Sequence, residues 1–400
     1  MSSQKPLQGI RIIELGNLVA APFAGKIFSE FGAEVIKVEE PKRGDALRNW
    51  RIMHEDTSVW WYVQSRNKKS VTANMREEDG QEVVRSLIEQ ADVVLENFKP
   101  GTLEKWGLGY EAIKENNPSI IFTRISGYGQ TGPYKEKPGF GSVAEAMGGL
   151  RYLTGYPDRP PVRVGIAIGD MVAGLYAVIG TLIALRAREH DEEQKGQVVD
   201  VALYEAVFSL LEGILPEYDL TGTIRERTGS TLPGIAPSNT YECKDGKHIV
   251  IGGNGDRIFQ RLMIAIGKEE FAHDERFSTN QGRADHVEMI DAIIEDWTKQ
   301  YSIKEVQQML DVASVPVAPI YSIEDIAQDE HYKARDMLQE VTLPDGEKLV
   351  VPGIVPKLSG TPGEIDWNGP KLGEHNEDIY EKLVGLTRED VEELRKKGII

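Results

Sequence analysis

Asp170 is the residue of this sequence best placed to do chemistry. It is the only acidic residue between positions 162 and 186, and fifteen uncharged, mostly apolar residues follow it. A carboxylate that opens an apolar helix accepts N–H groups of the first turn, so it is a favoured helix cap. The same helix terminus keeps a carboxylate ionised and fixed, which suits a nucleophile. The residues alone leave both interpretations open, and the two are compatible.

Other common kinds of catalytic site are not supported by the spacing. The seven histidines stand singly, without a second histidine or a cysteine pair at metal-ligand spacing, so we expect no metal. No serine stands in a G-x-S-x-G elbow. The first strand–helix turn, E-L-G-N-L-V-A-A-P, lacks the G-x-G-x-x-G spacing of nicotinamide enzymes, but its N–H groups still suit another phosphate.

Basic residues gather between positions 66 and 105, on an acidic background. They are Arg66, Lys68, Lys69, Arg76, Lys99 and Lys105. Two interpretations remain open: a pocket for a cofactor with several phosphates, or solvated surface charge.

Composition limits the compartment and the partners. A chain of 400 residues usually forms two domains. The net charge of -18 argues against binding to nucleic acid or anionic membranes. The single cysteine, Cys243, and an N-terminus without a signal-peptide pattern predict a cytoplasmic protein. The apolar stretch 171–185 is shorter than the ~20 residues that span a bilayer, so we expect a buried helix.

These residues must be positioned by alternating strands and helices. Strands are expected at 10–15, 33–38, 71–73, 93–95 and 120–125, with helices at 22–31 and 80–90 between them. This alternation predicts an α/β fold with a doubly wound parallel sheet, whose ligands bind beyond the carboxyl ends of the strands. After a break near residue 220, a hairpin around Asp245-Gly246 and several helices predict a smaller α+β unit.

Several motifs in order resemble one family. They include G-I-R-I-I-E-L-G-N-L-V-A-A-P-F-A-G, F-G-A-E-V-I-K-V-E, A-D-V-V-L-E-N-F-K-P-G, I-S-G-Y-G-Q-T-G-P, the G-D of Asp170, K-G-Q-V, D-E-R-F-S and S-V-P-V-A-P-I. The sequence resembles the class III CoA-transferases, the CaiB/BaiF family that includes formyl-CoA transferase, essentially from end to end.

The resemblance implies a Rossmann-like large domain built from both chain ends, with a smaller inserted domain. On that model the large domain is 1–200 plus 345–400, the small domain is 225–325, and 201–224 and 326–344 are linkers. The resemblance also implies an interlocked homodimer. Its ligands would be an acyl-CoA and a small carboxylic acid, with coenzyme A as substrate and no tightly bound cofactor.

The implied mechanism assigns the nucleophile to Asp170. Its carboxylate attacks the acyl-CoA thioester, and an aspartyl anhydride and then an enzyme–CoA thioester follow. Each step needs N–H donors for an oxyanion. We expect these donors in the glycines of 252–255 or 229–234, for which ordinary turn formation is the alternative.

The resemblance also assigns CoA contacts. They are Asn17, Leu18, Ala20, Arg76, Asn97, Phe98, Lys105 and Lys137. Phe98 is expected to stack on adenine and Lys105 to meet a phosphate. Val19 stands where relatives often have glutamine. A lysine of formyl-CoA transferase aligns near Pro138, with Lys137 only its neighbour, so formyl transfer is not expected.

Two alternatives concern the reaction. The related α-methylacyl-CoA racemases use a histidine base where this chain has Phe140, which carries no proton. A non-catalytic CoA-binding protein would be expected to lose the nucleophile, but Asp170 is present. Transfer is therefore favoured.

The identity of the acids that are exchanged is less directly indicated by the sequence. Many relatives use succinyl-CoA or another dicarboxylic donor, whose distal carboxylate favours an arginine. Arg48, Arg51, Arg151 and Arg163 are the candidates. A carnitine-like or aromatic acid is the alternative substrate.

Overall fold

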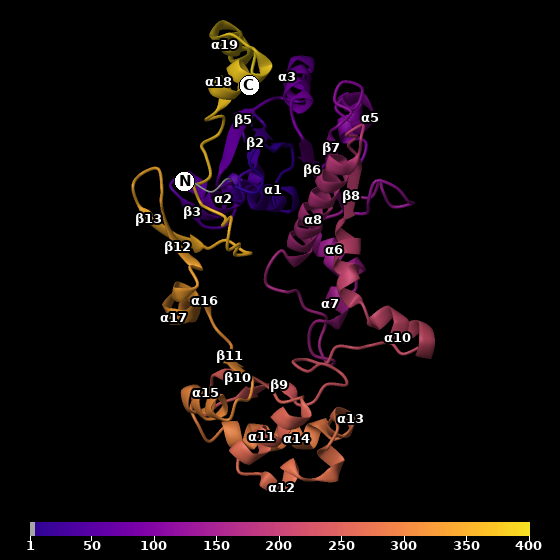
Figure 1. Cartoon of the computed structure of the whole chain (residues 1–400), viewed down its shortest axis with the longest axis vertical. Helices are drawn as coiled ribbons and strands as arrows, with labels where there is room; N and C mark the ends of the chain where they lie inside the picture. Colours follow the sequence, from indigo (N-terminus) through magenta and orange to yellow (C-terminus); the bar gives the residue numbers. More distant parts are fainter. Residues whose placement is uncertain (1–4) are drawn as a thin grey trace. The chain divides into compact units, whose positions relative to one another are not determined.

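The computed structural model describes residues 5–400, which form two compact units (Figure 1). Unit 1 consists of the described residues up to Leu150 together with Val164–Gly222 and Ala334–Ile400. Unit 2 consists of Arg151–Arg163 and Thr223–Lys333. Each unit contains its own hydrophobic core. Residues 201–224, assigned above to a linker, hold the end of a strand and two helices, α9 (Leu203–Phe208) and α10 (Ile214–Thr221).

A six-stranded parallel sheet forms the centre of unit 1, in the order β5-β2-β1-β6-β7-β8. The strands are β1 (Arg11–Glu14), β2 (Glu34–Glu39), β5 (Lys68–Thr72), β6 (Val93–Glu96), β7 (Ile121–Ser126) and β8 (Val198–Ala202). The predicted α/β class with a parallel sheet is confirmed. Most of these strands are buried on both faces, which explains why they read as nearly continuous apolar runs.

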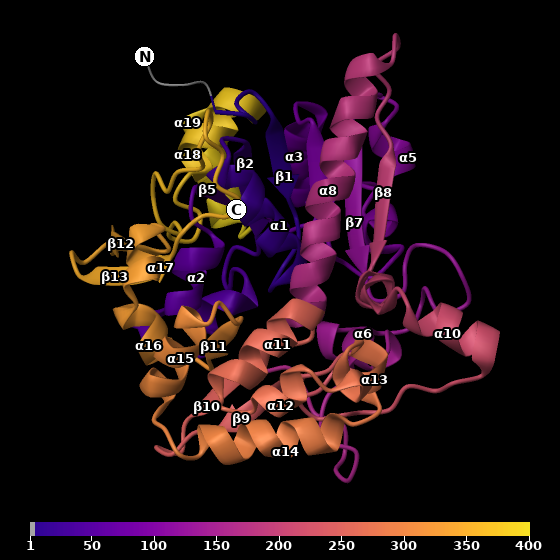
Figure 2. The same ribbon diagram turned by 60° about the horizontal axis from the view of Figure 1, so that its bottom comes forward.

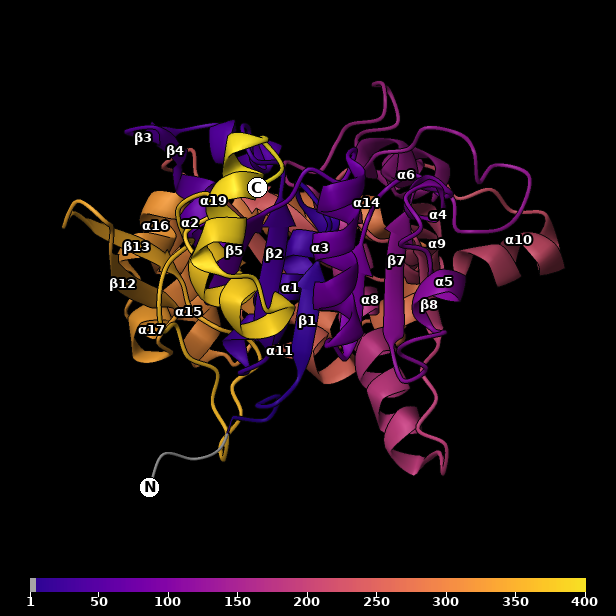
Figure 3. The same cartoon turned by 90° about the horizontal axis from the view of Figure 1, so that it is seen from above.

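Helices cover both faces of this sheet (Figure 3). Ile12 packs on one face with α1 (Ala20–Glu30) and α8 (Ile168–His190), and Ile13 packs on the other with α3 (Glu78–Glu89) and α19 (Arg388–Lys396). Successive side chains of a strand point to opposite faces, so the two cores use alternate residues. In α3 the buried residues Val83, Val84, Leu87 and Ile88 recur at helical spacing.

Helix α8 is longer than the sequence predicted. It has 23 residues, whereas we expected only 171–185. Within residues 5–400 it is the one helix whose length and composition would allow it to cross a membrane, and half of its most apolar 18-residue window is buried. Figure 2 shows α8 beside α1, β7 and β8. A Cβ on Gly174 would lie 2.9 Å from the Ala20 carbonyl oxygen, so this glycine permits close packing of the two helices.

The edge strand β5 is covered by a segment far along the chain. Asn67 N–H donates to the Trp367 carbonyl, and His375 N–H donates to the Ser70 carbonyl. The Asn376 side chain accepts from Thr72 N–H at 2.8 Å. These bonds occupy backbone groups that an exposed edge strand would offer to other chains.

Unit 2 is a smaller α+β body. Its antiparallel sheet has the order β11-β10-β9, with β9 (Ser238–Glu242), β10 (His248–Gly252) and β11 (Val317–Pro319). The hairpin predicted around Asp245-Gly246 is confirmed by the pairing of β9 with β10. Helices α11 (Asp256–Ala265), α14 (Val287–Thr298) and α15 (Ile303–Val312) supply its core.

Candidate active site

The sheet of unit 1 has its switch point between β1 and β6. From β1 the chain adds β2 on one side, and it later places β6 on the other side of β1. In parallel sheets of this kind, ligands bind where the strand order reverses, beyond the carboxyl ends of the strands. Asn17 follows β1 and Asn97 follows β6, so both predicted CoA contacts flank this point.

Asn17 and Asn97 join the two loops by reciprocal hydrogen bonds. The Asn17 N–H donates to Oδ1 of Asn97 at 2.8 Å, and Nδ2 of Asn97 donates to the Asn17 carbonyl at 2.9 Å. A Cβ on Gly16 would lie 3.0 Å from the same Oδ1. The Asn97 side chain is therefore engaged in fixing the first loop.

Buried charges hold the next residue of that loop. Leu18 has a φ of 65°, which is unusual for a residue with a side chain, and its N–H donates to both carboxylate oxygens of Asp45. Asp45 pairs with Lys37 at 2.8 Å, and Lys37 also pairs with Glu14 at 3.0 Å. Burial alone would raise the pKa of Asp45, but Lys37 outweighs it and lowers that pKa. The positive φ of Leu18 is thus stabilised by an ionised carboxylate.

Asp170 lies near the carboxyl ends of the strands, as these loops do. Helix α8 connects β7 to the parallel strand β8, so it runs against the strands and begins near their carboxyl ends. Its other end is fixed near their amino ends, where Arg188 donates to the carbonyl of Ser119, just before β7, at 3.1 Å. The N-cap residue of α8 is Ala167, and Asp170 is the third residue of the helix. The interpretation of Asp170 as the cap is therefore wrong, because the helix begins earlier than its apolar stretch.

The half-buried carboxylate of Asp170 lies against Gly141. Gly141 opens α6 (Gly141–Met147), and a Cβ there would be 2.2 Å from Oδ2 of Asp170. Gly169 also packs closely, since a Cβ on it would lie 2.9 Å from the Gly141 carbonyl oxygen. Gly174, one turn further along α8, meets Ala20, the first residue of α1. Asp170 thus lies against the start of α6, one helical turn from the contact between α8 and α1.

The remaining predicted CoA contacts also follow the carboxyl ends of strands. Arg76 follows β5 and is exposed, and Lys105 ends the short helix α4 (Thr102–Lys105) after β6 and is exposed too. Exposed Lys137 lies over the Tyr134 ring, 3.5 Å from its centroid. Half-buried Phe98 packs edge-on against Trp106, with ring centroids 5.5 Å apart. The structure thus leaves the side chains of Arg76 and Lys105 at the surface, while Phe98 is partly taken up by the core.

Half of the predicted basic cluster has a structural role instead. Arg66 pairs with Glu30 and is buried, and Lys69 pairs with Glu34 at 2.7 Å. Lys68 is buried and pairs with Glu14 at 2.8 Å, and its burial lowers its pKa to about 8. Burial and ion pairing remove Arg66 and Lys68 from any phosphate pocket, and Lys69 is engaged by Glu34.

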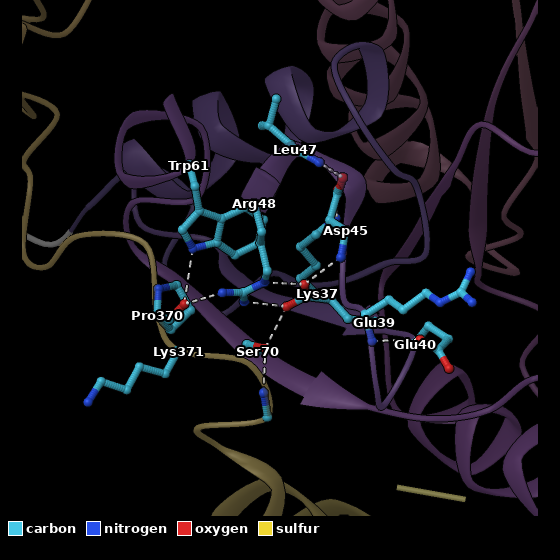
Figure 4. Close-up of polar contacts among 12 residues, drawn as sticks. Lys37, Glu39, Glu40, Asp45, Leu47, Arg48, Trp61, Ser70, Pro370 and Lys371 are labelled. Atoms are coloured by element: carbon cyan, nitrogen blue, oxygen red, sulfur yellow. Dashed lines mark hydrogen bonds and ion pairs between the residues drawn. The ribbon is translucent and has the colours of Figure 1, made fainter. Parts of the chain in front are cut away.

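Arg48, a candidate for binding a distal carboxylate, is also structural. Its Nε and Nη2 donate to the two oxygens of Glu39 at 2.8 Å each, and Nη1 donates to the Pro370 carbonyl at 3.1 Å. Its guanidinium lies 3.7 Å from the centroid of the Trp61 ring. Figure 4 shows the bonds from Arg48 to Glu39 and Pro370. Each of its three nitrogens thus donates a hydrogen bond within the protein, which gives Arg48 a structural role, and it also lines the cavity described below.

A second group of side chains was not detectable from sequence spacing. His54, in the hairpin of β3 (Met53–His54) and β4 (Thr57–Ser58), lies 2.7 Å from Asp345, between β12 (Leu338–Thr342) and β13 (Lys348–Pro352). Glu347 completes a set whose ligand atoms lie within 4.8 Å of one another. Asp345 also lines a cavity of about 1040 Å³ that contains Lys42, Arg43 and Lys371 but none of the predicted CoA contacts.

The family is shown by comparison with known proteins. The model of CoA-transferase family III matches residues 7–376, and the chain belongs to this family of enzymes. It is 48% identical, over the full length of both chains, to the succinyl-CoA–D-citramalate CoA-transferase of Chloroflexus aurantiacus. It is 42% identical to the beta subunit of the succinyl-CoA–L-malate CoA-transferase of that organism, covering 99% of this chain and 98% of the relative.

A solved structure agrees with the fold. The crystal structure of a CaiB/BaiF family protein from Brucella suis superposes with a TM-score of 0.83 at 37% identity. The match covers 95% of this chain and 99% of the other. The resemblance drawn from the motifs is therefore confirmed for the family and for the mixed α/β architecture. The roles of single residues remain proposals.

Proposed function

We propose that this protein transfers CoA from succinyl-CoA to a hydroxylated dicarboxylic acid of the citramalate or malate kind, with Asp170 as nucleophile. The names of the full-length relatives support both the donor and the class of acceptor. The place of Asp170 carries the assignment of the nucleophile. It is a half-buried carboxylate near the carboxyl ends of the strands, one helical turn from the contact of α8 with the start of α1.

The chemistry proceeds by four acyl transfers in which the thioester energy is retained. The Asp170 carboxylate attacks the succinyl thioester, and the CoA thiolate leaves as a mixed anhydride forms. The thiolate then attacks the aspartyl carbonyl, which releases succinate and leaves an enzyme–CoA thioester. The acceptor carboxylate attacks this thioester and again displaces the thiolate. Attack of the thiolate on the acceptor carbonyl yields the new acyl-CoA and regenerates Asp170.

The predicted contact residues divide into those that position the first loop and those that bind the CoA phosphates. Asn17, Leu18 and Ala20 present the first loop to CoA, and Asn97 fixes that loop from β6. Arg76, Lys105 and Lys137 meet its phosphates. The oxyanion donors expected in 252–255 or 229–234 belong to unit 2. Phe140, beside Gly141, is 67% exposed and carries no proton, so the racemase alternative lacks its second base at this position.

The test is covalent trapping on intact protein. The protein is incubated briefly with succinyl-CoA and quenched with hydroxylamine or borohydride, and Asp170→Ala and Asp170→Asn are treated in parallel. We expect a modification that maps to Asp170 and is absent from both variants. Initial rates with citramalate, malate and butyrate as acceptors then test the acceptor class. Equal trapping in the variants, or α-proton exchange without CoA transfer, would refute the proposal.

The protein is also proposed to act as an interlocked homodimer. Helix α8 presents an exposed apolar stripe at spacing i, i+1, i+4, i+7 and i+8, formed by Leu175, Tyr176, Ile179, Leu182 and Ile183. A stripe of this kind in unit 1 fits an interface with a second copy. We expect a dimer by light scattering, and Ile179→Lys to dissociate it while Arg186→Gln does not. A wild-type monomer would favour a different second chain, since several relatives are named as alpha or beta subunits.

A further inference from the structure

Gly141 makes an unusually close contact with the proposed nucleophile. A Cβ at this position would lie 2.2 Å from Oδ2, 2.6 Å from Cγ and 3.0 Å from Oδ1 of Asp170. All three atoms of the carboxylate group thus face the space that any side chain at position 141 would occupy. Carbon–oxygen contacts are favourable only beyond about 3 Å, so no side chain fits while the carboxylate keeps this place.

The backbone of Gly141 does not itself require glycine. It is not among the glycines with a positive φ, and it is the first residue of an α-helix, where other residues are accepted. Alanine is the better helix former of the two residues. A turn or a strained conformation therefore does not explain this glycine, and the space that Asp170 occupies does.

Neighbouring glycines hold the same region by backbone contact. A Cβ on Gly169 would lie 2.9 Å from the Gly141 carbonyl oxygen, which brings the start of α8 onto the start of α6. A Cβ on Gly127 would lie 2.9 Å from Cα of Gly139, which brings the loop after β7 onto the residues before α6. Backbone atoms make these contacts, and they have no rotamers through which a close contact could be relieved.

We propose that Gly141 is a positioning residue that sets the orientation of the Asp170 carboxylate and leaves room for the acyl group and CoA sulfur that it carries in turn. The inference rests on the proposed role of Asp170. Attack on a thioester requires one carboxylate oxygen to be held in line with the carbonyl carbon. Backbone contact with Gly141 on one side of the carboxylate restricts the orientations that it can adopt.

A substitution at this position is expected to move Asp170 and to leave the fold intact. The atoms that a new Cβ meets are the far end of a flexible side chain, so rotation of Asp170 relieves the contact without a backbone shift. Misplacement of a reacting group by about 1 Å costs on the order of 100-fold in rate. We therefore expect Gly141→Ala to lower kcat about 100-fold and to leave KM for succinyl-CoA within about threefold.

The matched control is Gly165→Ala. Gly165 lies five residues before Asp170, and a Cβ there would meet nothing within 4 Å. We expect its kcat to equal that of the wild type. Rapid-quench measurement of the first acylation separates the chemical step from product release, and Gly141→Ala should slow that step by the same factor as kcat.

Thermal unfolding tests the contact independently of activity. Gly141→Ala should lower Tm in the wild-type background and leave it equal or raised in an Asp170→Ala background, a difference of at least about 3 °C. A kcat within threefold of wild type, or equal Tm shifts in both backgrounds, would overturn the inference. Coupled Tm shifts without any trapped adduct on the wild type would instead refute the proposed role of Asp170 while supporting the contact.

Discussion

Replacement of Arg48 by alanine is expected to destabilise unit 1 strongly. The residue is 8% exposed and joins β2, through Glu39, to the distant Pro370. Without it, Glu39 retains as donors the Ser70 hydroxyl at 2.6 Å and the Asp45 N–H at 2.9 Å, but no cation directly bonded to it. The Trp61 ring also loses the guanidinium that stacks on it.

The magnitude follows from the buried carboxylate. Removing one partner of a buried ion pair costs about 3–5 kcal/mol, because the other charge remains without compensation. For a unit of this size that loss lowers Tm by on the order of 10 °C. Arg48→Lys should fall between wild type and alanine, because an ammonium group keeps the charge but cannot donate to both oxygens of Glu39 in the same geometry.

Differential scanning fluorimetry and chemical denaturation measure the change, with Arg43→Ala as the control. Arg43 is an exposed arginine of the same loop, so its removal should change stability by no more than about 0.5 kcal/mol. An Arg48→Ala protein that melts within 2 °C of wild type, by the scale of about 2–4 °C per kcal/mol, would refute the reasoning. A raised KM for a dicarboxylate with unchanged Tm would restore Arg48 as a substrate contact.

Two further predictions concern the contact of His54 with Asp345, which joins two hairpins, and the contact of Asn97 with the first loop. The hydrogen bond to Asp345 raises the pKa of His54 in the folded protein. The protonated His54 therefore stabilises the fold fully below the pKa of unfolded histidine, about 6.5, and this contribution is lost as pH rises through the folded pKa. The Tm difference between wild type and His54→Gln should therefore shrink as pH rises from about 6 to 8, and a constant difference would contradict the ion pair. Asn97→Ala should raise KM for acyl-CoA at least about threefold, since the Asn17 N–H loses its acceptor. Asn97→Asp keeps that acceptor and should be milder, so equal effects of the two variants would argue against the loop contact.

The strands of unit 1 were predictable because burial on both faces gives continuous apolar runs. Strand β8 was missed because Val198 and Asp200 are exposed, which interrupts that signal. The start of α8 was placed too late because Ala167 offers no capping side chain and 162–169 contains glycines and β-branched residues that resemble extended chain. Local patterns report burial well and report helix ends without side-chain caps poorly.

The candidate site was only partly predictable, for a different reason. Motif order located Asp170 and the first loop, but a charge count cannot separate a paired cation from a free one. Lys68 forms an ion pair with Glu14 and Arg48 forms one with Glu39, and only the fold brings these carboxylates to them. The contact of Gly141 with Asp170 joins residues 29 positions apart, a separation without any periodic signature.

The segment 367–376, which covers the edge strand β5, determines when the sheet can be completed during synthesis. The strands of unit 1 leave the ribosome first, and all of the residues Thr223–Lys333 follow before Trp367, His375 and Asn376 emerge. Through that interval the backbone of β5 has no native partner along one side. The nascent chain therefore exposes an unpaired edge strand, which could pair with other chains, for as long as translation of the inserted unit lasts.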